Sequence, residues 1–292
     1  MSTNVDSVVI WGEVLWDRFP DGDQLGGAPA NVAWHIAQAG GWARLVTRIG
    51  DDDDGRRALD RMAEAEVDTD LVQIDPERAT GEVTVRVEHG EPRYALQPGR
   101  AWERIACTQA VRDALADGGI FVYGTLAQRS AEGLEAWQQA AASATGLRVC
   151  DLNLRPGDTP GAAITAGLAV ADLVKLNDRE LAWLREAFGW RDPIAALRER
   201  ARIVAVTHGA DGSTLHGAHG ALAIAGLPAA PGGDNVGCGD SYLAILVHGL
   251  TCGWDLESSG RAASRWAAAV ASARGATPVF DDERIAELLG TT

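Results

Sequence analysis

The residues best suited to chemistry form one short segment, Asp-Asn-Val-Gly-Cys-Gly-Asp-Ser, at residues 234–241. Gly237 and Gly239 bracket one small residue, so backbone N–H groups can turn inward without a Cβ atom in the way. The apolar run at 242–247 predicts a helix directly behind them, and its positive end would point at the same place. These features favour a cradle for an anion, in which Asp240 could take a proton from a hydroxyl group. A structural interpretation, in which Asp240 only caps a helix and the glycines only make a turn, stays open.

Composition narrows the choice of partners. The chain has 292 residues, 46% of them hydrophobic, which is enough for one large core or two modest ones. Its formal charge of −15 argues against nucleic acid or an anionic membrane as a partner, because either requires a basic face. We expect a cytoplasmic protein, since no basic residue precedes the first apolar run and no apolar stretch approaches the length of a membrane span. A nucleotide remains possible, because it needs only local positive potential.

Lysine and cysteine usage exclude several kinds of site. Lys175 is the sole lysine, so any Schiff-base chemistry would have to use it. No Gly-x-x-x-x-Gly-Lys-Ser/Thr segment is present, which excludes a P-loop. The cysteines show neither CxxC nor histidine-paired spacing, so neither a zinc site nor a disulfide framework is indicated.

Short apolar segments alternate with amphipathic ones along most of the chain, which predicts a mostly parallel sheet wound by helices. The expected strands are residues 7–11, 44–50, 120–123, 148–151, 173–176 and 203–207. The expected helices include residues 29–39, a helix opened by Asp51 to Asp54 and ending near 67, and residues 256–274. The four aspartates indicate a solvated helix start rather than a metal site. Ligands bind at the carboxyl ends of the strands in such sheets.

Two segments do not fit this alternation. Residues 13–22 alternate in part and end in a turn signal, and residues 82–88 alternate with one polar face before a turn at 89–92 leads into 93–97. We expect residues 13–25 and 81–97 to form a small sheet that stands off the main domain, with an exposed face that could serve as a dimer surface.

Polar residues follow several of the expected strands. Asp151, Asn153 and Arg155 lie on one side of an extended segment, which a buried strand interior would not tolerate, so they should face a cleft. Asn177 and Glu180 have the spacing of a capping box, which is the interpretation the residues alone favour.

Two further sites give only a weak signal by themselves. Asp17, close to Pro20 and Gly22, is typical of a turn residue. Asn31 follows the paired glycines at 26 and 27 and offers a donor and an acceptor from the first turn of a helix. The histidine at 208 is expected to be a loop residue.

Five segments, in this order, resemble the motifs of the ribokinase-like (PfkB) carbohydrate kinases: residues 26–31, 151–155, 177–180, 207–212 and 234–240. Asn235 and Cys238 depart from the usual Asp-Thr-x-Gly-Ala-Gly-Asp. The resemblance implies a single ribokinase-like α/β domain over residues 1–292 with a small β-sheet lid. It also implies ATP-dependent phosphoryl transfer, with Asp240 as the base and the amides of Gly237, Cys238 and Gly239 as the anion hole.

The same resemblance implies roles for other residues. The sugar would be bound by Asp17, Gly27, Asn31 and Arg155, and ATP by Asn177, Glu180, Thr207, Gly209 and Gly212. Glu180 would position Mg²⁺, in part through water. Asp234, with carbonyl groups of the loop at 275–278, would match a monovalent cation site for K⁺.

Residues 12–17, 26–31 and 101–105 look most like fructokinases, which implies fructose as substrate and fructose 6-phosphate as product. One alternative is a 2-keto-3-deoxygluconate kinase, since Arg155 could serve a carboxylate. Arg93-Tyr94-Ala95 stands where those enzymes carry a Tyr-Tyr-Arg element, which favours a neutral sugar. A nucleoside kinase fits less well, because no extra aromatic pair for a base accompanies Trp16. A catalytically silent sugar or nucleotide sensor on the same scaffold is the alternative from another class.

Overall fold

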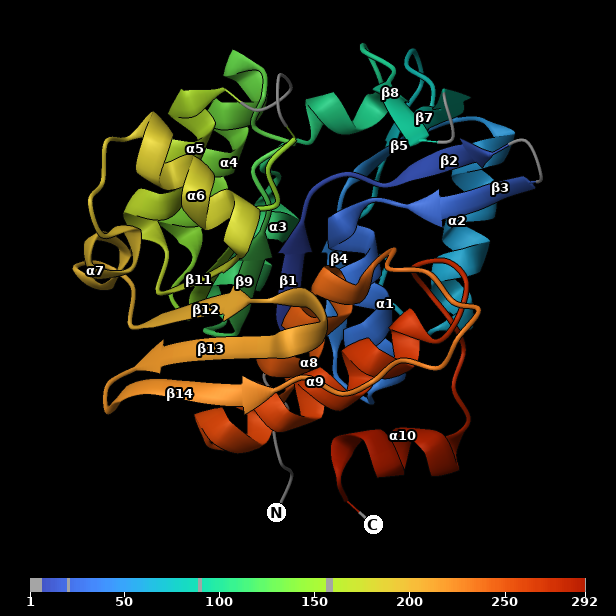
Figure 1. The fold of residues 1–292 in the computed structure, drawn as a ribbon. Helices are drawn as coiled ribbons and strands as arrows, with labels where there is room; N and C mark the ends of the chain where they lie inside the picture. Colours follow the sequence, from blue (N-terminus) through green and yellow to red (C-terminus); the bar gives the residue numbers. More distant parts are fainter. Residues whose placement is uncertain (1–6, 20–21, 89–90, 156–159, 292) are drawn as a thin grey trace.

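The computed structural model describes residues 7–19, 22–88, 91–155 and 160–291, and its main feature is an eight-stranded sheet (Figure 1). The strand order is β14-β13-β12-β11-β10-β9-β1-β4. Six neighbouring strands run parallel: β1 (Val8–Trp11), β4 (Ala43–Val46), β9 (Ile120–Tyr123), β10 (Arg148–Asp151), β11 (Leu173–Asn177) and β12 (Ile203–Thr207). The expected mostly parallel α/β sheet is therefore confirmed.

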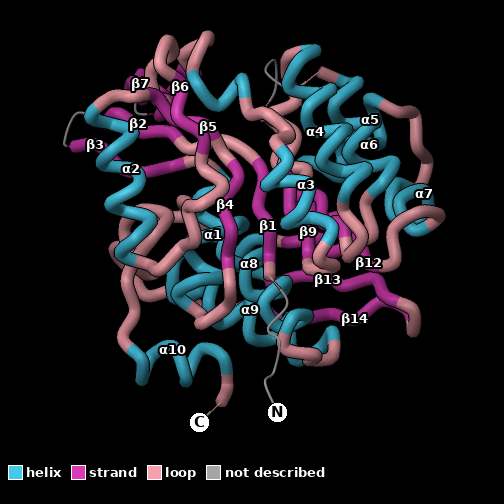
Figure 2. Tube along the Cα trace, turned by 180° about the vertical axis from the view of Figure 1, so that it is seen from behind, coloured by secondary structure: helices cyan, strands magenta, loops and turns pink. Residues whose placement is uncertain are grey.

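Helices cover both faces of this sheet, because successive strand residues point to opposite sides. Val8 and Ile10 belong to the core beneath α1 (Ala28–Gln38), α8 (Cys238–Thr251) and α9 (Leu256–Ala271). Val9 and Trp11 belong to the core of the other face. That face is covered by α3 (Gln109–Ala116), α4 (Ala131–Ser143), α5 (Gly161–Val170), α6 (Asp178–Ala187) and α7 (Pro193–Arg198) (Figure 2). The last helix, α10 (Asp282–Leu289), packs on α9.

The antiparallel hairpin of β13 (Gly212–Gly217) and β14 (Gly220–Ala225) extends the sheet beyond β12 and was not predicted from the sequence. The expected strand at 44–50 is wrong in one respect, because the chain leaves the main sheet at Thr47. Its second half, β5 (Arg48–Gly50), pairs instead with β6 (Gln73–Asp75) in a separate two-stranded sheet. No helix in the described part of the chain is long and apolar enough to span a membrane.

A second sheet of four strands lies beyond the end of β1, at the upper right of Figure 1. It consists of β3 (Gly22–Gly26), β2 (Leu15–Phe19), β7 (Gly81–Glu88) and β8 (Glu91–Leu96), in that order. The two segments that the sequence set apart therefore do form a small separate sheet. Of the expected turn at 89–92, His89 and Gly90 lie outside the described residues.

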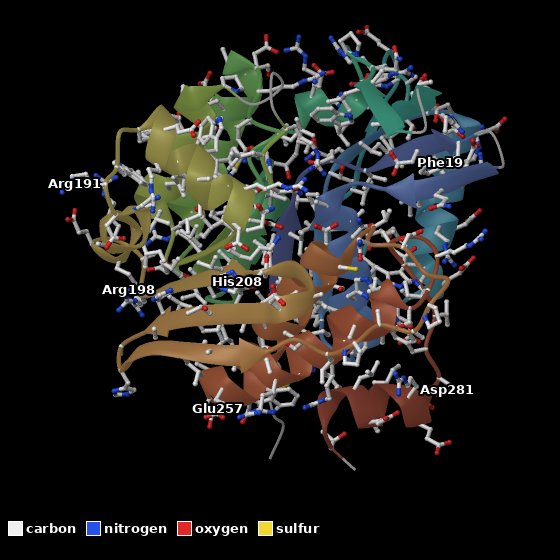
Figure 3. All side chains as sticks on the ribbon, in the orientation of Figure 1. Phe19, Arg191, Arg198, His208, Glu257 and Asp281 are labelled. Atoms are coloured by element: carbon white, nitrogen blue, oxygen red, sulfur yellow. The ribbon has the colours of Figure 1, made fainter. Side chains whose placement is uncertain are left out.

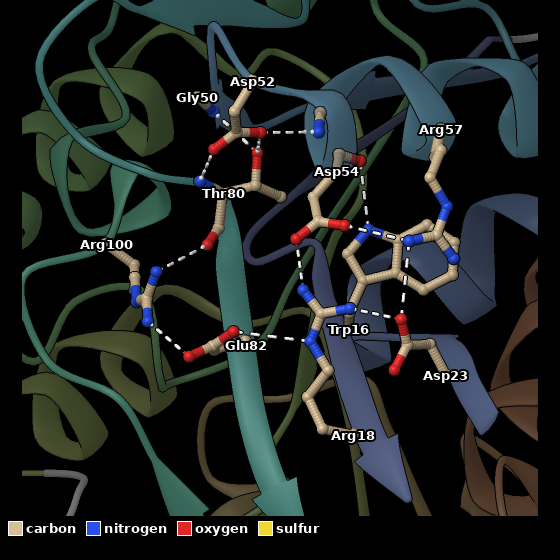
Figure 4. Close-up of polar contacts among 11 residues, drawn as sticks. Trp16, Arg18, Asp23, Gly50, Asp52, Asp54, Arg57, Thr80, Glu82 and Arg100 are labelled. Atoms are coloured by element: carbon tan, nitrogen blue, oxygen red, sulfur yellow. Dashed lines mark hydrogen bonds and ion pairs between the residues drawn. The ribbon is translucent and has the colours of Figure 1, made fainter. Parts of the chain in front are cut away.

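Charged side chains tie the small sheet to α2 (Asp53–Glu64), as Figure 4 shows. Arg18 of β2 forms ion pairs with Asp23, Asp54 and Glu82. Asp52 caps α2 through Gly55 N at 2.8 Å and also accepts hydrogen bonds from Thr80 N at 2.8 Å and Thr80 Oγ1 at 2.6 Å. The aspartate run thus starts a helix as expected, but part of it holds β7 instead of facing solvent.

Candidate active site

Gly237, directly before α8, is required by its surroundings, and Gly239 is approached closely by a side chain. Gly237 precedes the helix in the left-handed region, with φ 73°, and a Cβ there would lie 2.6 Å from Ala276 Cβ. A Cβ on Gly239 would lie 3.0 Å from Lys175 Nζ. Cys238, Gly239 and Asp240 form the first helical turn, whose N–H groups have no intrahelical partner. This turn therefore presents amides and the positive helix end to an anion.

Asp240 is held in place by a residue from the other end of the chain. Asn31 Nδ2 donates to Asp240 Oδ2 at 2.8 Å, and the amide must face this way because an ionised carboxylate only accepts. Asn31 Oδ1 is buried and has no hydrogen-bond partner among the described residues. That oxygen is a free acceptor beside the catalytic candidate, and a substrate hydroxyl group could donate to it.

Two further carboxyl groups lie close to this pair. Glu13 is 4% exposed, and burial raises its pKa to about 7; the charge of Arg155 opposes this shift and that of Asp240 adds to it. Burial also raises the pKa of Asp17 to about 6, again against the charge of Arg155. The carbonyl of Glu13 would lie 2.4 Å from a Cβ on Gly27, which has φ 104°. Glu13 therefore lies near both Gly27 and the charge of Arg155, which also acts on Asp17, while Asn31 contacts Asp240.

Glu13 was missed by sequence reasoning. The available signal was a carboxylate directly after a buried strand and a glycine, followed by more apolar residues. An acid in such a position can be charged only if a cation or a ligand accompanies it.

A small hollow at the ends of β1, β9 and β10 has a volume of about 10 Å³, room for roughly one water molecule. Its polar lining includes Glu13, Asp151, Asn153 and Arg155. Arg155 Nη1 donates to Asn153 Oδ1 at 2.9 Å, and Asn153 has a positive φ of 36°. The polar strand exit predicted at 151–155 is present, and the hollow itself is too small for more than a water molecule.

The ion pair of Lys175 with Asp151 is a second feature of the site that sequence reasoning missed. Lys175 Nζ lies 3.1 and 3.3 Å from the two carboxylate oxygens of Asp151, and both side chains are buried. Burial raises the pKa of Asp151, whereas Lys175 lowers it. Burial opposes the charged form of Lys175, but the neighbouring carboxylates raise its pKa. This ion pair lies directly beneath the backbone of Gly239.

A larger cavity of about 680 Å³ opens on the other side of the glycine turn. It is lined by Lys175 and by several residues predicted to contact ATP: Asn177, Thr207, Gly209 and Gly212, together with Cys238 and Gly239. His208, labelled in Figure 3, also lines it; its ring nitrogens lie 2.8 Å from Asp178 Oδ1 and 2.9 Å from Thr214 Oγ1. Both ring nitrogens of His208 therefore have partners, as expected for a structural loop residue.

Glu180 does not line that cavity. Its oxygens accept hydrogen bonds from Leu154 N at 2.7 Å and Asn177 N at 2.8 Å, and Asn177 caps α6 in return. The capping box is therefore present. Glu180 is 6% exposed and each of its oxygens accepts a backbone hydrogen bond, so the contacts observed are those of a capping residue.

The carboxylate oxygens of Asp234 also accept hydrogen bonds from backbone N–H groups. Oδ1 accepts from Val236 N and Oδ2 from Gly275 N, each at 3.0 Å. Burial raises the pKa of the Cys238 thiol to about 11, so this residue acts as a small neutral side chain in the turn. Within the described ranges, no three His, Cys, Asp or Glu side chains are grouped to hold a metal ion.

Known proteins resemble this chain over most of its length. Residues 22–283 match the family model described as pfkB family carbohydrate kinase. The chain is 29% identical over 263 residues to a fructokinase of Klebsiella pneumoniae, covering 82% of this chain and 84% of the relative. It is 25% identical to a putative sugar kinase of Pyrococcus horikoshii, covering 92% and 86%.

Solved structures show the same fold. A fructokinase of Xylella fastidiosa with bound ATP superposes with a TM-score of 0.87 at 23% identity, covering 98% of both chains. An aminoimidazole riboside kinase of Salmonella enterica, with its riboside and an ATP analogue, gives a TM-score of 0.82 at 21% identity, covering 97% of this chain and 100% of the other.

Proposed function

Because the chain belongs to the pfkB family of carbohydrate kinases and is a sugar kinase of that family, we propose that it transfers the γ-phosphoryl group of ATP to a primary hydroxyl of a small sugar. The first candidate is fructose, giving fructose 6-phosphate, because fructokinases are among its relatives. The observation that carries the proposal is the position of Asp240, held by Asn31 and directly after the glycine turn.

Asp240 is related to the linings of both cavities. Its charge acts on Glu13 and Asp151, which line the small hollow, and its neighbour Gly239 lines the large one. A sugar on the first side and ATP on the second would place an acceptor hydroxyl, the carboxylate and the γ-phosphoryl group together. Holding them in this order turns a bimolecular encounter into an aligned reaction.

In the proposed step, the sugar oxygen forms a bond to the γ-phosphorus while the bond from that phosphorus to the ADP oxygen breaks. Asp240 accepts the hydroxyl proton, a contribution of about 10²–10⁴-fold. The amides of the turn from Gly237 to Asp240 stabilise the charge on the transferred group. Lys175 supplies a positive charge beneath the turn and compensates Asp151.

Metal ions would act at the edges of this arrangement. Mg²⁺ would be held by the ATP phosphates and, through water, by Glu180, where it would neutralise phosphate charge. Asp234 is our candidate for a K⁺ site, because each of its oxygens keeps a lone pair after accepting one N–H group. Activity in potassium and in tetramethylammonium chloride tests the latter.

The charges near Arg155 favour a neutral sugar over a 2-keto-3-deoxy acid. Arg155 acts on Asp17 and Glu13, so its positive charge is already shared between two carboxyl groups of the chain. A substrate carboxylate would add a third negative group there. Hydroxyl groups, in contrast, can donate to Asp17 and to the free Asn31 Oδ1.

We also infer that the small sheet acts as the lid of a single-domain enzyme, because β2 carries Asp17 and pairs with β7 of the separate sheet. A homodimer through its outer face and a cytoplasmic location are proposals on the sequence alone. Light scattering of the purified protein, with and without sugar, tests the dimer.

The decisive experiment compares Asp240→Asn with Asp281→Asn. Asp281 caps α10 far from the site and is labelled in Figure 3, so it controls for the loss of a helix-starting carboxylate. We expect Asp240→Asn to lower sugar-dependent ADP release by about 10²-fold or more while ATP binding persists, and Asp281→Asn to leave turnover unchanged. Near-normal turnover of Asp240→Asn would refute the role. Nucleotide binding without ADP release for any sugar in a panel would instead indicate a sensor.

A further inference from the structure

One face of the buried helix α1 carries three polar side chains, at spacings of four and three residues. Asn31 binds Asp240, as described above. His35 Nε2 lies 2.8 Å from the carbonyl oxygen of Ala276. Gln38 donates to Pro278 O at 3.1 Å and accepts from Phe280 N at 2.6 Å. Since i, i+4 and i+7 share one helix face, α1 holds three points of the C-terminal part of the chain along a single line.

The tautomer of His35 follows from its other partner. Trp266 Nε1 lies 3.1 Å from His35 Nδ1, and an indole N–H can only donate. Nδ1 is therefore the acceptor and carries no proton. The proton of the neutral ring is on Nε2, where it is donated to the Ala276 carbonyl. The three groups form a directed chain of hydrogen bonds from Trp266 through His35 to Ala276.

This chain is buried, and it is not a pH switch. His35 and Trp266 are both 0% exposed. Burial lowers the pKa of His35 to about 4, an effect that the Ala276 carbonyl only partly opposes. The ring is therefore neutral at physiological pH, and the direction of the hydrogen bonds is constant.

Ala276 is in direct contact with the glycine turn of the site. A Cβ on Gly237 would lie 2.7 Å from Ala276 Cα and 2.9 Å from its carbonyl oxygen, the same oxygen that His35 binds. Asp234 fixes the preceding residue of this loop through Gly275 N. The loop that backs the turn is thus held from two sides, by Asp234 and by His35.

We propose that His35 is a positioning residue for phosphoryl transfer: by holding the Ala276 carbonyl, it fixes the surface on which Gly237 packs and so places the anion-binding amides. This inference rests on the proposed function. Amides that are misplaced by about 1 Å lose more in the transition state than in the bound ground state, so the loss should fall on kcat.

The test uses three variants that differ in which hydrogen bond they remove. His35→Phe keeps a ring but has no donor for Ala276. His35→Gln retains an N–H at a similar reach. Trp266→Phe removes the indole donor and leaves the His35 bond to Ala276 in place.

We expect kcat to fall about 10- to 100-fold in His35→Phe, with the KM for ATP changed less than about threefold. His35→Gln should recover most of this loss. Trp266→Phe should unfold at lower urea concentration than the wild type yet keep kcat within about twofold, because one buried hydrogen bond is lost but not the one that reaches the turn. Wild-type kcat in His35→Phe, or an equal loss in Trp266→Phe, would overturn the proposal. If His35→Phe does not fold, a kcat fall of tenfold or more in Trp266→Phe, which keeps the bond from His35 to Ala276, overturns the proposal.

A second measurement needs no sugar. ADP with fluoroaluminate mimics the transferred phosphoryl group, and we expect its affinity to fall tenfold or more in His35→Phe while ADP alone binds as in the wild type. Unchanged fluoroaluminate affinity would overturn the proposal. A wild type that binds this mimic but phosphorylates no sugar would refute the proposed function and leave the role of His35 standing. Nitrogen-15 NMR should show the Nε2–H form of His35, and the Nδ1–H form would contradict the hydrogen-bond chain.

Discussion

Replacing Lys175 by methionine removes the sole lysine charge and keeps an unbranched side chain of similar length. The substitution leaves Asp151, whose side chain is 4% exposed, near the charges of Asp240 and Glu180 with no ammonium group beside it. A carboxyl group at that depth takes up a proton rather than remain charged. The variant should therefore fold with Asp151 protonated.

The size of the effect follows from the proton that the folded variant must hold. The unfolded chain releases it near pH 4, so each further pH unit costs about 1.4 kcal/mol of unfolding free energy. In the wild type the pKa of Asp151 is itself raised to about 7, so both chains lose stability up to about pH 7 and only the variant continues to lose it above. The pH-dependent deficit should be about 1.4 kcal/mol at pH 8 and about 3 kcal/mol at pH 9. The sign is fixed because the folded-state pKa is higher in the variant, so stability is lost as the pH rises.

Urea unfolding followed by tryptophan fluorescence at pH 7, 8 and 9 measures this deficit. Lys175→Met should approach the wild type as the pH falls toward 7, and the double variant Lys175→Met/Asp151→Asn should be more stable than Lys175→Met at pH 9. Arg148→Met is the matched control, because its ion pair with Asp172 at 3.1 Å is one-third exposed at the arginine and should contribute only about 0–1 kcal/mol. A deficit of Lys175→Met that is equal at pH 7 and pH 9 would refute the reasoning.

Three further predictions concern the turn, the buried acid and the small sheet. Gly237→Ala should lower the unfolding free energy by about 1–3 kcal/mol and kcat by about 100-fold. The reason is that a left-handed φ of 73° and a 2.6 Å approach to Ala276 both exclude a Cβ at this position. A kcat at the wild-type level would contradict this prediction. In the wild type the folded-state pKa of Glu13 is raised to about 7, so about 3 kcal/mol of unfolding free energy should be lost between about pH 4.5 and 7, and Glu13→Gln should abolish this loss. Thermal unfolding across this pH range checks the prediction, and an unchanged pH profile would count against it. Arg18→Met should lower the unfolding free energy by about 1 kcal/mol at low salt and by less in 1 M NaCl, because the ion pairs of Arg18, among them that with Asp54, are partly exposed. A loss in urea unfolding that does not depend on salt would show that these ion pairs are not its cause.

Local patterns were sufficient for most of the elements. The expected strands at 120–123, 148–151 and 203–207 coincide with β9, β10 and β12, because a short apolar run between turn signals is typical of a buried parallel strand. The hairpin β13–β14 was missed, since β13 is rich in glycine and polar residues and β14 in glycine and alanine. The two segments form strands because β13 pairs with the edge of β12. The break at Thr47 was missed because no Gly, Pro or other turn signal separates β4 from β5, which meet different partner strands.

By itself, the sequence determined what depends on neighbours along the chain: the glycine turn followed by Asp240, the capping box of Asn177 and Glu180, and the alternation of strands and helices. Only the tertiary structure decided which distant groups meet. Asn31 and Asp240 are 209 residues apart, and His35 and Ala276 are 241 apart, yet each pair is joined by a hydrogen bond of 2.8 Å. The ionisation of a buried acid depends on such encounters, because the charges and dipoles that surround it come from other elements, which no local spacing encodes.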